Sequence, residues 1–488
     1  MTDAYETVIG LEVHCQLLTQ SKLFCGCSTR FGAEPNSHVC PVCLGLPGAL
    51  PVPNAAAIQL AMRAALALEC TVREHSVFAR KNYFYPDMSK NYQISQYELP
   101  LNEDGRLRIE VEGAVRDIGI ERIHLEEDAA KNLHGVGSGT ATLVDFNRGG
   151  TALIEIVSRP ELRSAAEAEA YLRRLREILM ACGVNDGNLE EGSFRCDANV
   201  SIRPMGQEKL GTRTELKNIN SFRFVRKAIE YEAARQRAVV SSGGVVVQET
   251  RTWHETQEKT ITMRAKEEAM DYRYFPDPDL PPLRVSQADI EAVRETLPEL
   301  PADKRARYRT ELGLTDADAA LMTSHPRISE YFERGAAQLR DQAGLAIDKA
   351  GKRVANFIQS EVMRYVTTDG LAATFPVQAD DVAELLALVE GDTISGKMAK
   401  GVFATMIETG KRAKQVVDEQ GLAQMSDTAA LEEIIRSMLA DHSSQVAEYR
   451  AGKKGLLGFF VGKVMKATKG SANPKVVNEL LTKLLEEP

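Results

Sequence analysis

The sequence predicts an α+β protein, with a strand-rich first part and a second part that is helical almost throughout. Up to about residue 290, most segments alternate apolar and polar residues, with few helical patterns among them. A proline-rich stretch at 274–282 then interrupts the chain, and helical spacing of apolar residues follows it. Because 488 residues are too many for one hydrophobic core, we expect two to four domains.

Composition places the chain among ordinary globular proteins, with 43% hydrophobic and 26% charged residues. No apolar run is long enough to span a membrane, and only Met1 to Ala4 precede the first strand. We therefore expect a cytoplasmic protein, whose eight cysteines are thiols or metal ligands. The net charge of −9 gives no support for nucleic-acid binding, which would need a local basic surface.

The first strand is predicted at 8–17, where apolar and polar residues alternate. Leu11, Val13 and Cys15 share the apolar face, and Glu12 and His14 lie on the other face. A carboxylate and an imidazole side by side can bind a metal or position a substrate. A half-buried edge strand with a solvated polar face would show the same pattern.

Local signals predict the remaining elements of the first part. Strand-like sequences predict strands at 106–112, 118–125, 152–157 and 194–203, and the last of these alternates strictly. Ser164, with Glu167 three residues later, is typical of the start of a helix, which runs to about Cys182. A second helix is predicted over 222–240, ended by Gly243 and Gly244.

Residues 194–203 and 212–218 are predicted to form a hairpin around a turn with Pro204 and Gly206. One face of this hairpin is charged and carries Arg195, Asp197, Glu215 and Lys217. A face of this kind suits a magnesium–nucleotide complex. A water-facing sheet with cross-strand ion pairs is the alternative.

Four cysteines predict a metal site: Cys25, Cys27, Cys40 and Cys43. Two close thiol pairs on either side of a short loop can converge on one tetrahedral Zn²⁺. Four thiolates leave no open coordination position, so this zinc would be structural and would hold the loop at 24–48. Four reduced buried thiols remain the alternative, and His38 is a less favoured substitute ligand.

The segment at 81–97 is crowded with lysine, amide and phenol groups and lacks apolar periodicity. This composition suits a loop that lines a site for phosphates and polar substrates, or else an aromatic-rich surface loop. Its candidate functional residues are Lys81, Tyr83, Tyr85, Lys90, Asn91 and Gln93.

Two acidic positions extend the first strand's polar face into a candidate cation site. Glu127 lies in a run of acids at a strand end, and Glu155 stands inside an apolar strand. A lone buried glutamate is costly unless it is paired or bound to a metal. Glu12, His14, Glu127 and Glu155 together suit one hard cation, most naturally Mg²⁺. Taken singly, each is more typical of a solvated or ion-paired residue.

The stretch at 274–282 is interpreted as a linker, because its prolines continue neither a helix nor a central strand. We place domains at 1–292, 293–392 and 393–488. Residues 391–398 nearly match a phosphate-binding loop. Met398 stands where a serine or threonine is required, and a helical pattern precedes the motif, so we reject it.

The last domain carries a basic stripe, since residues 450–475 contain no acid. Its lysines suit contacts to a phosphate backbone, or equally a solvated helix face. The candidate residues are Lys453, Lys454, Lys463, Lys466 and Lys469.

Taken together, these motifs resemble the GatB family, the B subunits of bacterial aspartyl/glutamyl-tRNA amidotransferases, over essentially the whole length. The matching segments are long, and they lie at 8–14, 31–36, 50–54, 81–97, 124–129, 153–158, 271–282, 455–462 and 473–474.

The resemblance implies a fold and a reaction. The first domain would be a cradle whose antiparallel sheet resembles that of glutamine synthetase, followed by an all-α domain and a YqeY-like tRNA-binding tail. ATP would phosphorylate the side-chain carboxylate of Asp-tRNA(Asn) or Glu-tRNA(Gln). Ammonia from the amidase partner, the A subunit, would then displace the phosphate. The small C subunit would complete a heterotrimer.

The resemblance also implies roles for the candidate residues. The set around Glu12 would bind Mg²⁺, the 81–97 loop would serve transamidation, and the charged hairpin would face ATP. The zinc would be structural. A different class remains open, namely a non-catalytic zinc-containing tRNA-binding protein whose acidic residues are structural.

Overall fold

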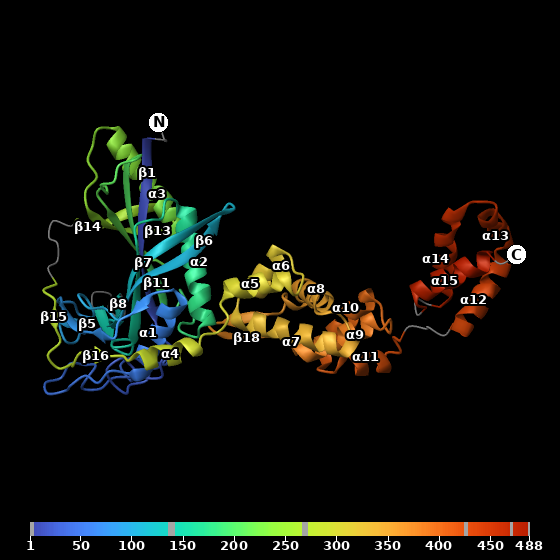
Figure 1. The fold of residues 1–488 in the computed structure, drawn as a ribbon, viewed down its shortest axis with the longest axis horizontal. Coiled ribbons are helices and arrows are strands. Elements are labelled where there is room, and N and C mark those ends of the chain that lie inside the picture. Colours follow the sequence, from blue (N-terminus) through green and yellow to red (C-terminus); the bar gives the residue numbers. More distant parts are fainter. Residues whose placement is uncertain (1–3, 135–141, 266–271, 424–427, 469–471, 487–488) are drawn as a thin grey trace. The chain divides into compact units, whose positions relative to one another are not determined.

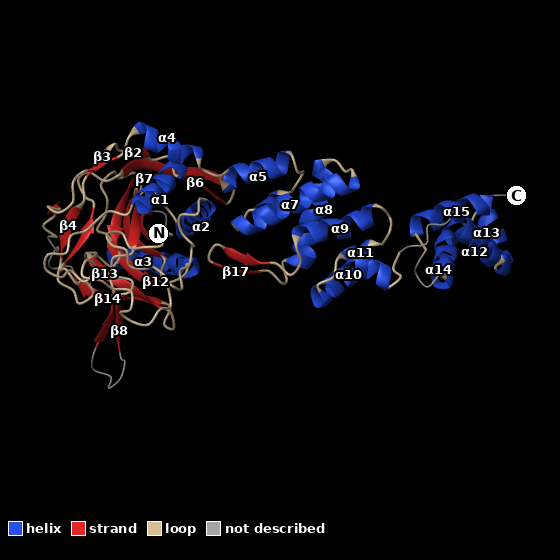
Figure 2. Ribbon diagram, turned by 90° about the horizontal axis from the view of Figure 1, so that it is seen from below, coloured by secondary structure: helices blue, strands red, loops and turns tan. Residues whose placement is uncertain are grey.

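The computed structural model describes residues 4–134, 142–265, 272–423, 428–468 and 472–486 (Figure 1). The chain divides into two compact units, residues 1–303 and 304–488. The first combines a large sheet with a few helices, and the second is almost entirely helical (Figure 2). The structure is thus of the mixed α and β class, with a helical C-terminal part.

A nine-stranded sheet forms the centre of the first unit. Its strands are antiparallel except for one parallel neighbour pair, β12 and β13. In spatial order they are β14 (Lys259–Ala265), β13 (Glu249–His254), β12 (Thr214–Ile219), β11 (Phe194–Pro204), β1 (Tyr5–Gln16), β10 (Ala152–Ser158), β7 (Ala114–Glu127), β6 (Asn102–Val111) and β2 (Thr71–Val72). The predicted strands at 106–112, 118–125, 152–157 and 194–203 are confirmed.

One face of this sheet is apolar and packs on helices. Leu11, Val13 and Cys15 of β1 are fully buried, as the alternation predicts. The covering helices are α1 (Ala55–Ala67), α2 (Ala165–Ala181) and α3 (Phe222–Ser241), which contribute to one hydrophobic core. Ser164 accepts a hydrogen bond from the Glu167 amide and caps α2, as predicted. With the helices on one face, the polar face is left for a site.

The described part of the first unit also contains smaller sheets of two or three strands. They are β3 (His75–Ser76) with β16 (Leu283–Arg284), β4 (Ala79–Asn82) with both β5 (Tyr92–Ser95) and β15 (Phe275–Pro276), and β8 (Lys131–His134) with β9 (Thr142–Asp145). The linker prediction for 274–282 is wrong. This segment pairs with β4, Asp277 binds Arg80 at 2.9 Å, and Leu280 is buried. Helix α4 (Gln287–Glu295) follows and begins with a capping box of Ser286 and Asp289.

The second unit contains two separate hydrophobic cores. The first core uses α5 (Pro301–Thr310), α6 (Asp316–Met322), α7 (Pro326–Ala343), α8 (Ile347–Phe357) with a π turn at Ile358–Val362, α9 (Ala379–Glu390), α10 (Gly396–Thr409) and α11 (Ala413–Glu419). A short hairpin joins β17 (Thr367–Asp369) to β18 (Ala372–Thr374). The boundary placed near 392 falls inside this core, which extends to Val417.

The other core is a bundle near the C-terminus. It contains α12 (Thr428–Asp441), α13 (Ser443–Arg450), a 3₁₀ turn at Lys454–Leu456, α14 (Leu457–Ala467) and α15 (Pro474–Glu486). The rejected motif at 391–398 follows helix α9 and runs into the start of α10, so it lacks the preceding strand of a phosphate-binding loop.

Candidate active site

Ionisable side chains form a row across the polar face of the central strands. His14 on β1 lies opposite Glu155 on β10 and opposite Arg195 on β11, and Glu155 lies opposite His124 on β7. Directly paired residues point to the same face of a sheet. The register thus gathers groups that are far apart in the sequence.

The centre of this row is a cluster of two histidines and two glutamates. His14 Nε2 lies 3.5 Å from a Glu155 oxygen and 3.7 Å from a Glu126 oxygen. His124 Nε2 lies 3.4 Å from Glu155. One atom each from His14, Glu126 and Glu155 fit within 4.8 Å of one another, which is close enough to share a cation.

The structure brings Glu126, and not Glu127, into this cluster. Glu127 points elsewhere: its carboxylate pairs with Lys90 Nζ at 2.5 Å and accepts the Ile94 amide at 2.9 Å. Side chains alternate along β7, so His124 and Glu126 share the site face and Glu127 does not. That alternation is the sequence signal that identifies Glu126.

Glu12 belongs to a second acidic group beside the first. Glu12, Asp197 and Glu215, from β1, β11 and β12, also place one oxygen each within 4.8 Å. Lys217 Nζ contacts Asp197 at 2.8 Å and Glu215 at 3.2 Å. The predicted hairpin is thus present, and three of its four charged residues converge here. The fourth, Arg195, binds Asp128 at 2.9 Å.

Burial and charge shift the pKa values of these groups in opposite directions. Burial, and then the nearby Glu155, raise the pKa of Glu12. Burial alone would raise the pKa of Glu155, but His124 and His14 hold it well below its usual value. Burial alone would lower the pKa of His124, but the nearby Glu155 and Glu126 raise it to about 9. Without a cation, the histidines neutralise the acids.

This pairing predicts that the magnesium-free protein loses stability as the pH rises from about 6.5 to 9. The pKa of His124 in the folded protein, about 9, exceeds its ordinary value of about 6.5. Protonated His124 therefore contributes its full stabilisation of the folded state below pH 6.5, and this contribution is lost as the pH rises through 9. Urea unfolding at both pH values measures this difference in the free energy of unfolding. His124→Gln should make the free energy of unfolding less dependent on pH. The same pH dependence in this variant and the wild type would contradict the role of His124.

The segment predicted as a loop at 81–97 begins in strand β4 and contains strand β5, so it is only partly a loop. Lys81, on β4, contributes a cation to the same cluster. Burial would lower the pKa of Lys81, but Glu126, Tyr274 and Glu155 raise it above its usual value. Its Nζ also lies 5.0 Å from the ring centre of Tyr272. Lys81 therefore stands where negative charge is concentrated.

The other predicted residues of this loop lie in different surroundings. Gln93 is buried and donates to the Glu127 carbonyl oxygen at 2.8 Å, whereas Tyr83 is partly buried beside Tyr272. Tyr85 and Asn91 are exposed. Lys90 pairs with Glu127 rather than with the cluster of His14 and Glu155.

A cavity of about 440 Å³ continues from the second acidic group along the polar face. It is lined by Val8, Gly10 and Glu12 of β1, by Ser201 of β11 and by Arg213, which precedes β12. This volume lies within the usual range for small-molecule sites, about 300–1,000 Å³. A ligand bound there would contact Glu12 of the second acidic group.

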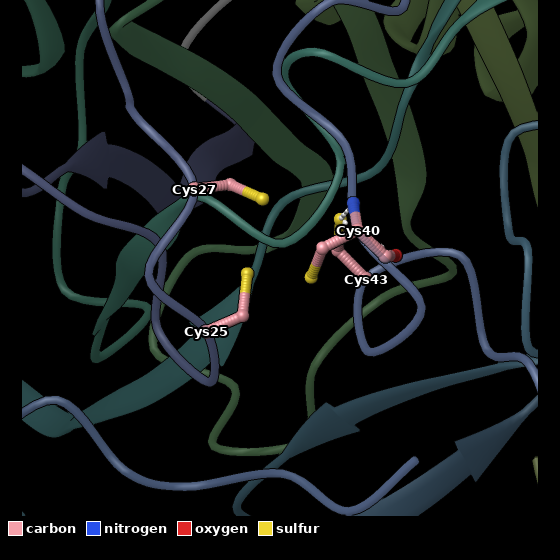
Figure 3. Close-up of side chains that lie close together, drawn as sticks. All are labelled: Cys25, Cys27, Cys40 and Cys43. Atoms are coloured by element: carbon pink, nitrogen blue, oxygen red, sulfur yellow. Dashed lines mark hydrogen bonds between the residues drawn. The ribbon is translucent and has the colours of Figure 1, made fainter.

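The four predicted cysteines converge from two loops, as Figure 3 shows. One sulfur from each of Cys25, Cys27, Cys40 and Cys43 lies within 4.8 Å of the others. Ligands of a tetrahedral zinc are separated by about 3.8 Å when each Zn–S bond is about 2.3 Å. Hydrogen bonding from Cys25, then from the Cys40 amide, and the nearby Lys22 ammonium lower the pKa of Cys43 to about 4. This donor set fits a zinc ion.

The cysteine loop packs directly against the 81–97 loop. Ser89 Oγ donates to the Cys43 carbonyl oxygen at 2.8 Å. Gly45 adopts φ +68°, and a Cβ atom there would meet Lys90 Cγ at 2.5 Å. Only glycine allows this contact, so the cysteine loop supports Lys90 and its partner Glu127.

The lysines of the C-terminal bundle are partly paired. Lys453 contacts Glu448 at 2.9 Å, and Lys454 Nζ lies 4.3 Å above the Tyr449 ring. Lys463 lies beside Phe459, and Lys466 is exposed. Lys469 lies outside the described residues. Among the described helices, none has the length and apolar character needed to cross a membrane.

The amino-acid sequence matches known proteins over nearly the whole chain. Residues 7–291 match the family described as the GatB/GatE catalytic domain, and residues 343–485 match the family described as the GatB domain. The B subunit of the aspartyl/glutamyl-tRNA(Asn/Gln) amidotransferase from Geotalea uraniireducens is 55% identical over 484 residues, 99% of each chain. Its counterpart from Geobacter sulfurreducens is 54% identical over 487 residues, again 99% of each chain, and that from Myxococcus xanthus is 51% identical over 482 residues, 99% of this chain and 98% of its own. The chain therefore belongs to the family of aspartyl/glutamyl-tRNA(Asn/Gln) amidotransferase B subunits.

Proposed function

We propose that this chain activates the side-chain carboxylate of Asp-tRNA(Asn), Glu-tRNA(Gln) or both with ATP and then amidates it. The observation that carries the proposal is the convergence of His14, Glu126 and Glu155 beside Glu12, Asp197 and Glu215. Two adjacent acid groups, each with a cation at hand, suit magnesium-assisted phosphoryl transfer.

In the first step, the carboxylate must become a better acyl donor. Its oxygen attacks the γ-phosphorus of ATP, the bond to ADP breaks, and an acyl phosphate forms. Mg²⁺ held by the acidic groups would neutralise the phosphate oxygens when bound. Lys217, which pairs with Asp197 in the second acidic group, can stabilise charge on the nucleotide. Lys81 lies beside Glu126.

In the second step, ammonia attacks the acyl carbon and inorganic phosphate leaves. We propose that the ammonia comes from glutamine hydrolysed by the amidase partner, and that the small C subunit would complete a cytoplasmic heterotrimer. The sheet would be a cradle that resembles the sheet of glutamine synthetase, an enzyme that also amidates a phosphorylated carboxylate. Co-expression of the three proteins and amidation assays with each misacylated tRNA test this function. No amidation of either tRNA would refute it.

The cysteine site is predicted to hold about one zinc per chain. Replacing Cys40 and Cys43 together by serine should remove it, because two of the four thiolates are lost. Metal analysis of the purified protein measures the content. Cys182→Ala is the matched control, since Cys182 is buried outside this group. Equal zinc in the double variant and the wild type would contradict the site.

The C-terminal bundle is predicted to bind the tRNA backbone. Deleting residues 424–488 should weaken tRNA binding and reduce its salt dependence, by about 0.9 in slope for each phosphate that the protein no longer neutralises. A cut at 410 would be less informative, because Val416 and Val417 of α11 belong to the preceding core. Filter binding over a range of salt concentrations measures the slope.

A narrower variant tests individual lysines of this bundle. Lys463→Gln with Lys466→Gln should lower the slope, while Lys349→Gln, on an exposed position of α8, should leave it unchanged. Wild-type affinity and slope in both the deletion and the double variant would contradict tRNA binding by the bundle.

A further inference from the structure

A cluster of aromatic side chains covers the 81–97 loop and is not explained by the chemistry of the acids. Tyr97 and Tyr274 stack face to face, with ring centres 4.3 Å apart and planes 5° from parallel. Tyr272 meets Tyr274 edge-on at 6.2 Å, and Tyr83 meets Tyr272 at 6.1 Å. These rings come from two segments far apart in the sequence, which the β4–β15 pairing brings together.

The outer part of this cluster is open to solvent. Tyr97 is 52% exposed although one of its faces is covered by Tyr274, so its other face is available. Phe84 is 73% exposed, and Phe275 is 45% exposed. Large exposed aromatic rings in one neighbourhood indicate a binding surface rather than a core.

The inner part of the cluster joins the acids through Lys81. The Lys81 ammonium lies over the Tyr272 ring, and it interacts with Glu126, Glu155 and Tyr274. The stacked pair is therefore continuous with the candidate phosphorylation site. A flat ligand on the stack would hold a group attached to it close to the acids.

We propose that the open face of Tyr97 stacks on the 3′-terminal base of the bound tRNA, an inference that rests on the proposed function. The reacting amino acid is esterified to the ribose of that nucleotide, so the base must lie within one aminoacyl-ribose of the acids. A nucleobase presents a flat π face that stacks on aromatic side chains, and unpaired ends are recognised in this way. The cation of Lys81 complements the charge of the RNA strand.

The test uses the assembled heterotrimer and uncharged tRNA with 2-aminopurine at its 3′ end. Stacking should quench the fluorescence of this base when the wild-type complex binds. Tyr97→Leu should lose most of the quenching, whereas Tyr97→Phe, which keeps the ring, should retain it. Tyr365→Leu is the matched control, because Tyr365 is 51% exposed in the second unit.

Kinetics supply a second readout. Tyr97→Leu should lower kcat/KM for the misacylated tRNA about 10-fold, the size expected for one base stack, with KM for ATP unchanged. Equal quenching in Tyr97→Leu and the wild type would overturn the proposal. An increased KM for ATP in Tyr97→Leu, with the quenching of the tRNA base unchanged, would also overturn it. That result would show that Tyr97 stacks on the adenine of ATP instead. Because quenching needs no reaction, it decides the stacking proposal even where amidation fails.

Discussion

Replacing Glu155 by glutamine is expected to lower tRNA-dependent ATP cleavage by about 10³-fold, with tRNA affinity nearly unchanged. Glutamine keeps the size of the side chain but removes the charge that faces His14 and His124. The cluster then has one acid fewer to hold the proposed Mg²⁺. Release of phosphate from ATP by the assembled complex, with and without misacylated tRNA, measures the effect.

A buried group that loses its partner also costs stability, about 3–5 kcal/mol in other proteins, so folding must be checked separately. Thermal unfolding of the variant shows whether the domain is intact at the assay temperature. Glu177→Gln is the matched control, since this partly buried glutamate lies on α2, behind the apolar face of the sheet. Wild-type cleavage by folded Glu155→Gln would remove the basis of the proposed function.

Replacing Lys81 by methionine is expected to lower amidation by about 10²–10³-fold while KM for the tRNA changes little. Methionine fills similar space but supplies no positive charge next to Glu126 and Glu155. The charge developing on the acyl phosphate would then lack its nearest cation on that side. Amidation with ammonium chloride as the nitrogen source isolates this step from the amidase partner.

Two further variants test whether the effect of Lys81→Met comes from loss of the positive charge at this position. Lys81→Arg keeps the charge but not the compact shape of the ammonium, and it should recover only part of the rate. Lys131→Met, on β8, should behave like the wild type, because Lys131 is exposed. A Lys81→Met variant with normal amidation would show that the cation near Glu126 has no role in the reaction.

The sequence predicts the sheet well because alternation is a local property. The period of two along β1 and β11 is visible in the residues themselves, and the apolar face follows directly. Helix α1 was not predicted, since its alanine-rich sequence gives a weak pattern. The 274–282 segment was misinterpreted because its partner, β4, lies far earlier in the chain and no local signal reveals it.

The site was predicted in part for the same reason. Glu12, His14 and Glu155 meet because strand register places them together, and the sequence indicates only that each is polar in an alternating strand. The choice between Glu126 and Glu127 depends on alternation along β7, because both residues are buried and burial alone does not separate them. The cysteine site is easier to predict from the sequence, because the cysteines form close pairs along the chain and the thiols of each pair must lie near one another. Family membership decides against the alternative of a non-catalytic protein.

The pairing of β15 with β4 also has a consequence for how the protein is made. Arg80 emerges from the ribosome early, but its partner Asp277 is synthesised 197 residues later. Contacts so distant in sequence form late in folding. The nascent chain can therefore build most of the sheet before the tyrosines at 272 and 274 reach Lys81. The aromatic surface beside Lys81 is completed only when synthesis of the first unit is nearly finished.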